Sequence, residues 1–139
     1  MREISTPLSL RVNRSERDDE GIRDRPPTRV LVVDDEAELV RAMARILKAR
    51  GFEVQTASNG MEALEILTKQ TFDVMLVDLV MPGMSGLELL KRAKTLQEQL
   101  EVVMMTAYAD VDTAVTSVKA GAYDFLTKPF DAGRLVCFF

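Results

Sequence analysis

From residue 29 onward, short apolar runs alternate with segments in which apolar residues recur every three or four positions. The runs are rich in β-branched residues, which is typical of strands that are buried on both faces. Strands are therefore expected at 29–33, 52–56, 72–77, 102–105 and 123–127. The periodic segments predict helices over 36–50, around 60–67, around 87–93 and over 111–118.

Strands that alternate with helices predict an α/β fold, with an open, doubly wound, parallel five-stranded sheet and helices on both faces. A closed barrel would need about 250 residues, whereas the chain has 139. Residues 1–28 differ from the rest, because they hold six arginines, six acidic residues and three prolines without a sustained period. We expect a flexible N-terminal arm at 1–28 and a folded domain at 29–139.

Polar side chains follow the predicted strands. Asp34 and Asp35 follow the first strand and Asp78 the third. Thr106 follows the fourth strand and Lys128 the fifth. Because the carboxyl ends of parallel strands meet at one edge of a sheet, we expect these side chains to converge.

Each of these residues, taken alone, has a simpler interpretation. The acid pair and Thr106 could cap helices, Asp78 could start a turn, and Lys128 could be a solvated charge. Together, however, they place three carboxylates at one edge, and these would repel one another unless compensated. A divalent cation and the lysine would supply the missing positive charge.

Composition restricts the chemistry. The chain has no histidine and one cysteine, Cys137. A Ser-His-Asp triad, a Cys-His pair, a His-ligated zinc site, an internal disulfide and a Cys-cluster metal site are therefore excluded. Cys137 lies in an apolar stretch, where we expect a packed, inert thiol. A metal would have to bind oxygen ligands, which favours Mg²⁺, Mn²⁺ or Ca²⁺.

The net charge of −4 does not favour a nucleic-acid surface or an anionic membrane as a partner. No apolar run has the length of a membrane span, and the polar N-terminus lacks the apolar core of a signal peptide. We therefore expect a cytoplasmic domain with no direct contact to nucleic acid or membrane.

Phosphoryl transfer fits these residues, since it depends mainly on positioning and on neutralising charge around the phosphoryl oxygens. An ionised carboxylate can attack phosphorus directly and form an acyl phosphate, so that no histidine is needed as a base. Mg²⁺ and a lysine would offset the charge, while a hydroxyl and a backbone N–H would bind the remaining oxygens.

Four segments of the chain resemble the receiver domain of two-component response regulators, the CheY-like family. They are Val-Leu-Val-Val-Asp-Asp-Glu at 30–36, the acid and turn-rich loop at 78–86, Met-Thr-Ala at 105–107, and the segment 121–130. The resemblance covers roughly residues 29–131. It implies a flavodoxin-like sheet with strand order 2-1-3-4-5.

The resemblance also implies roles for the acidic residues. By position, Asp78 would accept a phosphoryl group from a histidine kinase. Asp35 and Asp78 would ligate Mg²⁺ together with the backbone carbonyl of Val80, and Asp34 would act largely through water. The domain would catalyse its own phosphorylation and dephosphorylation without being a turnover enzyme.

The remaining roles concern phosphate binding and switching. Lys128 would pair with a phosphoryl oxygen, and Thr106 and the N–H of Ala107 would bind the phosphate. Phe125 matches the switch aromatic, which turns inward as Thr106 shifts and changes the surface formed by the fourth helix, fifth strand and fifth helix. Phe125 has no phenolic hydroxyl, so only the steric half of this switch is available.

Two further positions tune dephosphorylation in the family. They are Val80 and Tyr108, two residues after Asp78 and Thr106 respectively. We expect both side chains to impede water and to lengthen the phosphorylated state.

The chain beyond residue 130 is short for a fifth helix, since only nine residues remain. They allow roughly two and a half turns, started by Asp131 and weakened by Gly133. Either the chain is a fragment cut ahead of an output domain, which we favour, or another subunit covers this edge. Exposed Phe138 and Phe139 would promote association, which fits a homodimer through the fourth and fifth helices.

The functional hypothesis is thus a phosphoacceptor receiver domain of a larger, transcriptional regulator. The alternative is a stand-alone single-domain regulator that acts by binding a protein. An aspartate-nucleophile phosphohydrolase fits less well, because its second acid would stand where Val80 does. A degenerate receiver lacks support because the acceptor, acid pair, threonine and lysine are all present. A flavin module would need a first loop rich in Ser, Thr or Gly.

Overall fold

The computed structural model describes residues 26–107, 111–137 and 139. Strands and helices alternate in the following order: β2 (Arg29–Val33), α3 (Ala37–Ala49), β3 (Glu53–Ala57), α4 (Gly60–Lys69), β4 (Val74–Asp78), α5 (Gly86–Leu96), β5 (Glu101–Thr106), α6 (Val111–Lys119), β6 (Asp124–Thr127) and α7 (Ala132–Val136). The strands form one five-stranded parallel sheet in the order β3-β2-β4-β5-β6. Counted along the chain this is 2-1-3-4-5, so the expected doubly wound fold is confirmed.

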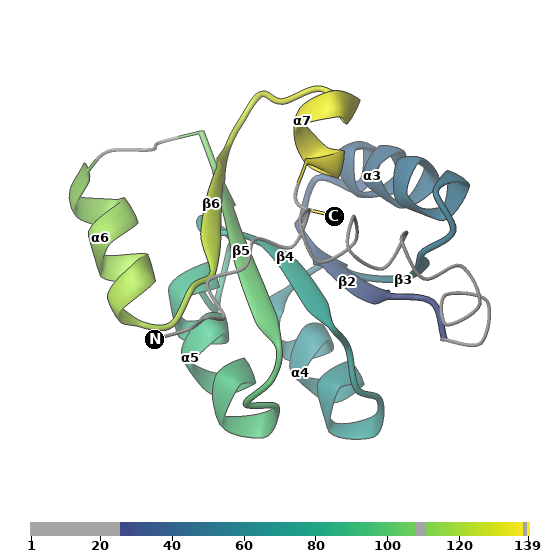
Figure 1. Cartoon of the computed structure of the whole chain (residues 1–139). Coiled ribbons are helices and arrows are strands. Elements are labelled where there is room, and N and C mark those ends of the chain that lie inside the picture. The colour runs from purple at the N-terminus through teal and green to yellow at the C-terminus, as the bar shows by residue number, and fades with distance from the viewer. Residues whose placement is uncertain (1–25, 108–110, 138) are drawn as a thin grey trace.

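Helices cover both faces of the sheet (Figure 1). α4 and α5 lie side by side on one face, and α3 and α7 lie together on the other. Alternate residues of each central strand point to opposite faces, so that both sides of the same strand are buried. Leu31 and Val33 belong to the cluster under α4 and α5, whereas Val30 and Val32 belong to the cluster under α3 and α7. This explains why the strands appear in the sequence as continuous apolar runs.

The expected strand boundaries hold to within two residues. β2 covers the expected residues. β3 and β4 begin one and two residues late and each end one residue later than expected. β5 is one residue longer at each end, and β6 begins one residue late. α3 ends at Ala49, and Gly51 follows with a φ of 93°, a conformation that glycine adopts without strain. The prediction that Gly51 stops this helix is confirmed.

Side-chain caps fix where three helices begin. The Asn59 side chain accepts a hydrogen bond from the Glu62 N–H at the start of α4, and Ser85 accepts one from the Glu88 N–H at the start of α5. Asp131 accepts one from the Arg134 N–H at the start of α7. Such caps satisfy N–H groups that have no partner inside the helix. The expected cap by Asp131 is confirmed.

The last helix is truncated, as expected, and α7 has only five residues. Beyond α7, the Phe139 N–H donates to the Val136 carbonyl at 3.0 Å, and Phe139 is buried with its ring centroid 4.9 Å from that of Phe52. The expectation of an exposed Phe139 is therefore wrong, because this ring packs on Phe52 and belongs to the core cluster under α3 and α7. Phe138 lies outside the described residues.

The expectation of a packed thiol is also wrong, because Cys137 is exposed. Leu135 is fully buried against the sheet. Two residues further along a helical turn the side chain points to the opposite side, and at Cys137 this is the side of the solvent.

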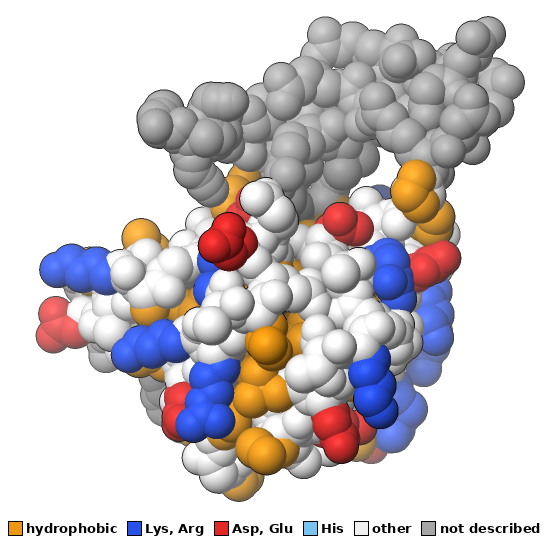
Figure 2. Space-filling model, turned by 90° about the horizontal axis from the view of Figure 1, so that it is seen from below, with side chains coloured by type: hydrophobic (Ala, Val, Ile, Leu, Met, Phe, Trp, Pro, Cys, Tyr) orange, Lys and Arg blue, Asp and Glu red, His pale blue; other side chains and the backbone are white. Residues whose placement is uncertain are grey.

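Acidic and basic side chains are interspersed around a small hydrophobic area on the face seen in Figure 2. Within the described residues, no helix combines the length and the apolar character needed to cross a membrane. Most of the expected arm, residues 1–25, lies outside the described residues, so the division at residue 28 stays a prediction.

Candidate functional site

The structure brings the strand-end residues together at one edge of the sheet. β4 ends in Asp78, β5 ends in Thr106, and Asp34 directly follows β2. These three strands are neighbours in the sheet, with Asp78 in register with Met105 of β5. Lys128 follows β6, and its backbone N–H donates to the Thr106 carbonyl at 2.8 Å. The Lys128–Pro129 peptide bond is cis.

Three carboxylates form the centre of this site. Asp34, Asp35 and Asp78 each offer one oxygen, and these oxygens all lie within 4.8 Å of one another. Asp34 and Asp78 are buried, whereas Asp35 is exposed. Clustered carboxylate oxygens are ligands that a hard divalent cation such as Mg²⁺ prefers. This donor set therefore fits the oxygen-ligated metal that the composition favours.

Asp34 does not cap the next helix. The helix N-cap is Glu36, whose side chain makes no capping hydrogen bond. Asp34 instead accepts the Glu36 N–H at 3.0 Å through Oδ1. Its other oxygen, Oδ2, is 2.8 Å from the Lys128 ammonium. The simpler interpretation of Asp34 as a helix cap is wrong.

Lys128 is surrounded by carboxylates. Its Nζ lies 2.8 Å from Asp34 Oδ2, 2.9 Å from Glu36 Oε1 and 3.3 Å from Asp78 Oδ2. Its side chain is 14% exposed, and the side chains of Asp34 and Asp78 are 0% and 10% exposed. The interpretation of Lys128 as a solvated charge is wrong.

Burial and charge shift the pKa of both central groups. Burial, followed by the charge of Asp34, raises the pKa of Asp78, although Lys128 and the Val80 N–H oppose this. Burial alone would lower the pKa of Lys128, but hydrogen bonds to Asp34 and Glu36 outweigh it and hold that pKa above its ordinary range. Lys128 is therefore charged at neutral pH. It lies beside the carboxylate of Asp78, whose ionised form would be stabilised by further positive charge.

The loop between β4 and α5 folds back onto Asp78. The Val80 N–H donates to Asp78 Oδ1 at 3.2 Å, and the Gly86 N–H donates to the Leu79 carbonyl at 2.9 Å. A Cβ at Gly86 would collide with the Asp78 carbonyl oxygen and come within 2.7 Å of Leu79 Cα. Only glycine allows this close return of the chain. The Val80 side chain itself is 57% exposed.

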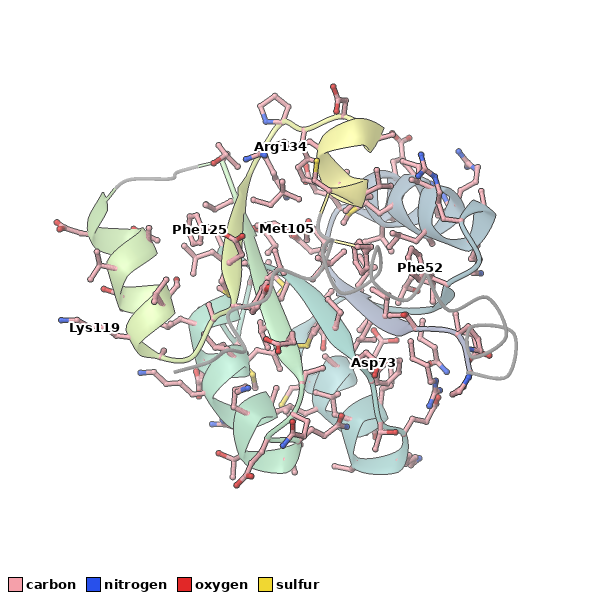
Figure 3. All side chains as sticks on the ribbon, viewed as in Figure 1. Phe52, Asp73, Met105, Lys119, Phe125 and Arg134 are labelled. Atoms are coloured by element: carbon pink, nitrogen blue, oxygen red, sulfur yellow. The ribbon has the colours of Figure 1, made fainter. Side chains whose placement is uncertain are left out.

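The surroundings of three other expected site residues, Thr106, Ala107 and Phe125, differ. Thr106 is fully buried, and Ala107 is exposed beside Lys128, Glu36 and Pro129 around a hollow of about 380 Å³. Phe125 is half-buried and packs against the cluster under α4 and α5. Figure 3 shows Phe125 on the side of β6 that faces α6. Tyr108 lies outside the described residues.

Two residues of the site had no role assigned from the sequence. Glu36 contacts Lys128, and its signal was a third acid directly after Asp34 and Asp35. Gly86 permits the loop to close, and its signal was a glycine at the end of a turn-rich segment.

The sequence profile of the response regulator receiver domain matches residues 30–138. The chain belongs to this family. The receiver domain is 45% identical over 107 residues to the DNA-binding transcriptional regulator NtrC of Escherichia coli strain K12, covering 77% of this chain and 23% of that protein. It is 38% identical over 107 residues to sporulation initiation phosphotransferase F of Bacillus subtilis strain 168, covering 77% of this chain and 86% of that protein.

Solved structures agree. The CheY-like response regulator receiver domain protein from Methanospirillum hungatei JF-1 superposes with a TM-score of 0.77 at 32% identity, covering 80% of this chain and 89% of that one. The receiver domain spans about a quarter of the length of the transcriptional regulators that it matches.

Family membership carries general properties. Receiver domains of response regulators are phosphorylated by histidine kinases, are linked to output domains and are not classical turnover enzymes. They bind Mg²⁺ at an acidic pocket, and in this chain Asp34, Asp35 and Asp78 form an acidic group.

Proposed function

We propose that this receiver domain accepts a phosphoryl group on Asp78 from the phosphohistidine of a histidine kinase. The observation that carries the proposal is the position of Asp78. Its carboxylate is buried at the end of β4, 3.3 Å from the Lys128 ammonium and within 4.8 Å of oxygens of Asp34 and Asp35. An acceptor needs this combination of a nucleophilic oxygen and surrounding positive charge.

The chemistry needs no base. One Asp78 carboxylate oxygen forms a bond to phosphorus while the bond from phosphorus to the kinase imidazole nitrogen breaks, and the bond electrons leave with the imidazole. Lys128 pairs with a phosphoryl oxygen, and the Thr106 hydroxyl and the Ala107 N–H bind others. Mg²⁺ held by Asp34, Asp35, Asp78 and the Val80 carbonyl would neutralise charge on the phosphoryl group.

Switching would start at Thr106, as its hydroxyl moves toward the phosphoryl group. Phe125 would then turn inward, which changes the surface of α6, β6 and α7. Because Phe125 lacks a hydroxyl, this change relies on packing alone. Val80 and Tyr108 would slow the access of water to the acyl phosphate, and the half-exposed Val80 side chain beside Asp78 is consistent with this role.

The wider role we propose is that of a cytoplasmic receiver domain at 29–139 within a larger transcriptional regulator. The support is similarity to NtrC, of which the chain spans 23%. The output domain would then read α6, β6 and α7, with a homodimer through α6 and α7. A stand-alone regulator that binds a protein partner is the second candidate, because the chain spans 86% of phosphotransferase F.

The test is incubation with Mg²⁺ and acetyl phosphate, followed by intact-mass measurement of the wild type and of Asp78→Asn. We expect a gain of one phosphate in the wild type and none in the variant. Removal of Mg²⁺ with EDTA should abolish the gain. A phosphate gain that survives the substitution would refute the assignment of the acceptor.

A further inference from the structure

The Lys128 ammonium has all its hydrogen-bonding capacity in use. An ammonium has three N–H donors, and Nζ lies within 3.3 Å of three carboxylate oxygens, one each from Asp34, Glu36 and Asp78. The contact with Asp78 is the longest of the three. In the unphosphorylated chain, Lys128 is thus held toward Asp34 and Glu36 rather than toward the acceptor.

Glu36 is the partner that Lys128 can release at the lowest cost. Its side chain is 62% exposed, so its carboxylate can return to water. Asp34, by contrast, has a fully buried side chain and holds the Glu36 N–H through its other oxygen. Losing Lys128 would leave a buried charge at Asp34 without compensation, which is far more costly than losing an exposed partner.

Glu36 also stands where another role would be expected. It occupies the N-cap position of α3, where a side chain usually accepts an N–H of the first turn, yet its side chain makes no such bond. The carboxylate reaches instead to Lys128, across 92 positions of sequence. This contact joins the start of α3 to the end of β6.

We propose that Glu36 is a positioning residue that restrains Lys128 in the unphosphorylated receiver domain and thereby slows phosphorylation. Phosphorylation requires Lys128 to give up one of its carboxylate partners and pair with an oxygen of the phosphoryl group. Glu36 is the partner that is released, and it competes with the incoming phosphoryl group for Lys128. This inference rests on the proposed role of Asp78 as the acceptor.

The test measures the rate of phosphorylation by acetyl phosphate with saturating Mg²⁺ in four proteins. They are the wild type, Glu36→Gln, Glu36→Asp and the control Glu38→Gln. Glu38 is an exposed acid in the first turn of the same helix and makes no ion pair within the described part of the chain. Its substitution changes the net charge by the same amount as Glu36→Gln.

We expect Glu36→Gln to be phosphorylated about two- to fivefold faster than the wild type, the range that loss of one exposed ion pair allows. Glu38→Gln should match the wild type. Glu36→Asp keeps the charge but is one methylene shorter, so it should lose the contact and behave like Glu36→Gln. Binding of beryllofluoride, a non-covalent phosphoryl mimic, should tighten by the same factor in both Glu36 variants.

Three outcomes would overturn the inference. Equal rates in the wild type and Glu36→Gln would show that Lys128 is not restrained, and a slower Glu36→Gln would show that Glu36 assists the reaction. Equal acceleration in Glu36→Gln and Glu38→Gln, with Glu36→Asp unchanged, would reduce the effect to net charge. If the wild type takes up no phosphate on Asp78, the proposed function itself fails, which is a different result from all of these.

Discussion

Lys128 places one positive charge among the carboxylates of Asp34, Glu36 and Asp78. This charge is less than three acids require, so the site keeps a negative excess when no metal is bound. The raised pKa of Asp78 follows from the same imbalance, since burial and the charge of Asp34 outweigh what Lys128 supplies. A site of this kind binds a divalent cation more favourably than a charge-balanced one would.

The first prediction concerns Asp78→Asn without metal. Because the folded state raises the pKa of Asp78, the carboxyl keeps its proton in the folded chain at a pH where it has lost it in the unfolded chain. Ionisation of Asp78 therefore reduces stability as the pH rises above its ordinary pKa of 3.8. Asp78→Asn removes this charge, so it should unfold at a higher temperature than the wild type near pH 7 in EDTA.

The advantage of Asp78→Asn should shrink as the pH falls, because the wild-type carboxyl then becomes protonated as well. Thermal unfolding followed by circular dichroism between pH 4 and pH 8 measures this. The pKa of Lys128 is also raised, but its contribution is lost only in alkali, well outside this range. An Asp78→Asn midpoint below that of the wild type at pH 7 would mean that the pairing with Lys128 outweighs the burial.

The sequence predicts that the site residues at the strand ends lie together. Each of them ends or follows a strand, and the carboxyl ends of parallel strands meet at one edge of the sheet. It assigns no role to Glu36, since Glu36 reaches Lys128 only through a side-chain conformation, and periodicity carries no information about that. The same limit applies to the partners of Asp34, which caps nothing and instead binds the Glu36 N–H and Lys128.

At the scale of elements, Gly86 connects the end of β4 to the start of α5. A Cβ here would meet the backbone at Asp78 and Leu79, and backbone cannot yield as a flexible side chain can. The sequence shows a loop dense in turn formers, but the requirement for glycine at this position comes from how closely the loop returns. This close approach depends on packing between elements, so local residue propensities do not predict it.

The second prediction is that Gly86→Ala destabilises the domain by about 2 kcal/mol or more, because overpacking against backbone forces the loop to move. The displaced loop should also lower the rate of phosphorylation of Asp78. Urea unfolding and the acetyl phosphate assay measure the two effects.

Gly133→Ala is the matched control, since its Cβ would meet Asp131 Oδ1 at an ordinary 3.5 Å. The control should be neutral or gain up to about 1 kcal/mol, as alanine favours helix. Similar losses in both variants would contradict the argument.

At the scale of the whole molecule, the last described residues contribute to the core beside the five-residue α7. Leu135 and Phe139 both join the core cluster under α3 and α7. The number of remaining residues predicts a truncated helix, but it cannot predict that Phe139 is buried. The position of Phe139 depends on the ring of Phe52, which is 87 positions earlier and comes into reach only in the folded chain.

The third prediction tests whether this aromatic contact stabilises the domain. Phe139→Ala removes a buried ring that packs on Phe52, and loss of a buried phenylalanine side chain typically costs about 3 kcal/mol. For a domain of this size the unfolding midpoint should fall by roughly 10 °C.

Cys137→Ala is the control, because the exposed Cys137 side chain should contribute little to stability. Phosphorylation of Asp78 at a temperature where both variants are folded should keep its wild-type rate, since no contact joins Phe139 to the acidic residues within the described part of the chain. A Phe139→Ala midpoint equal to that of Cys137→Ala would mean that Phe139 adds nothing to the core, and that the edge beside α3 is stable with a five-residue helix alone.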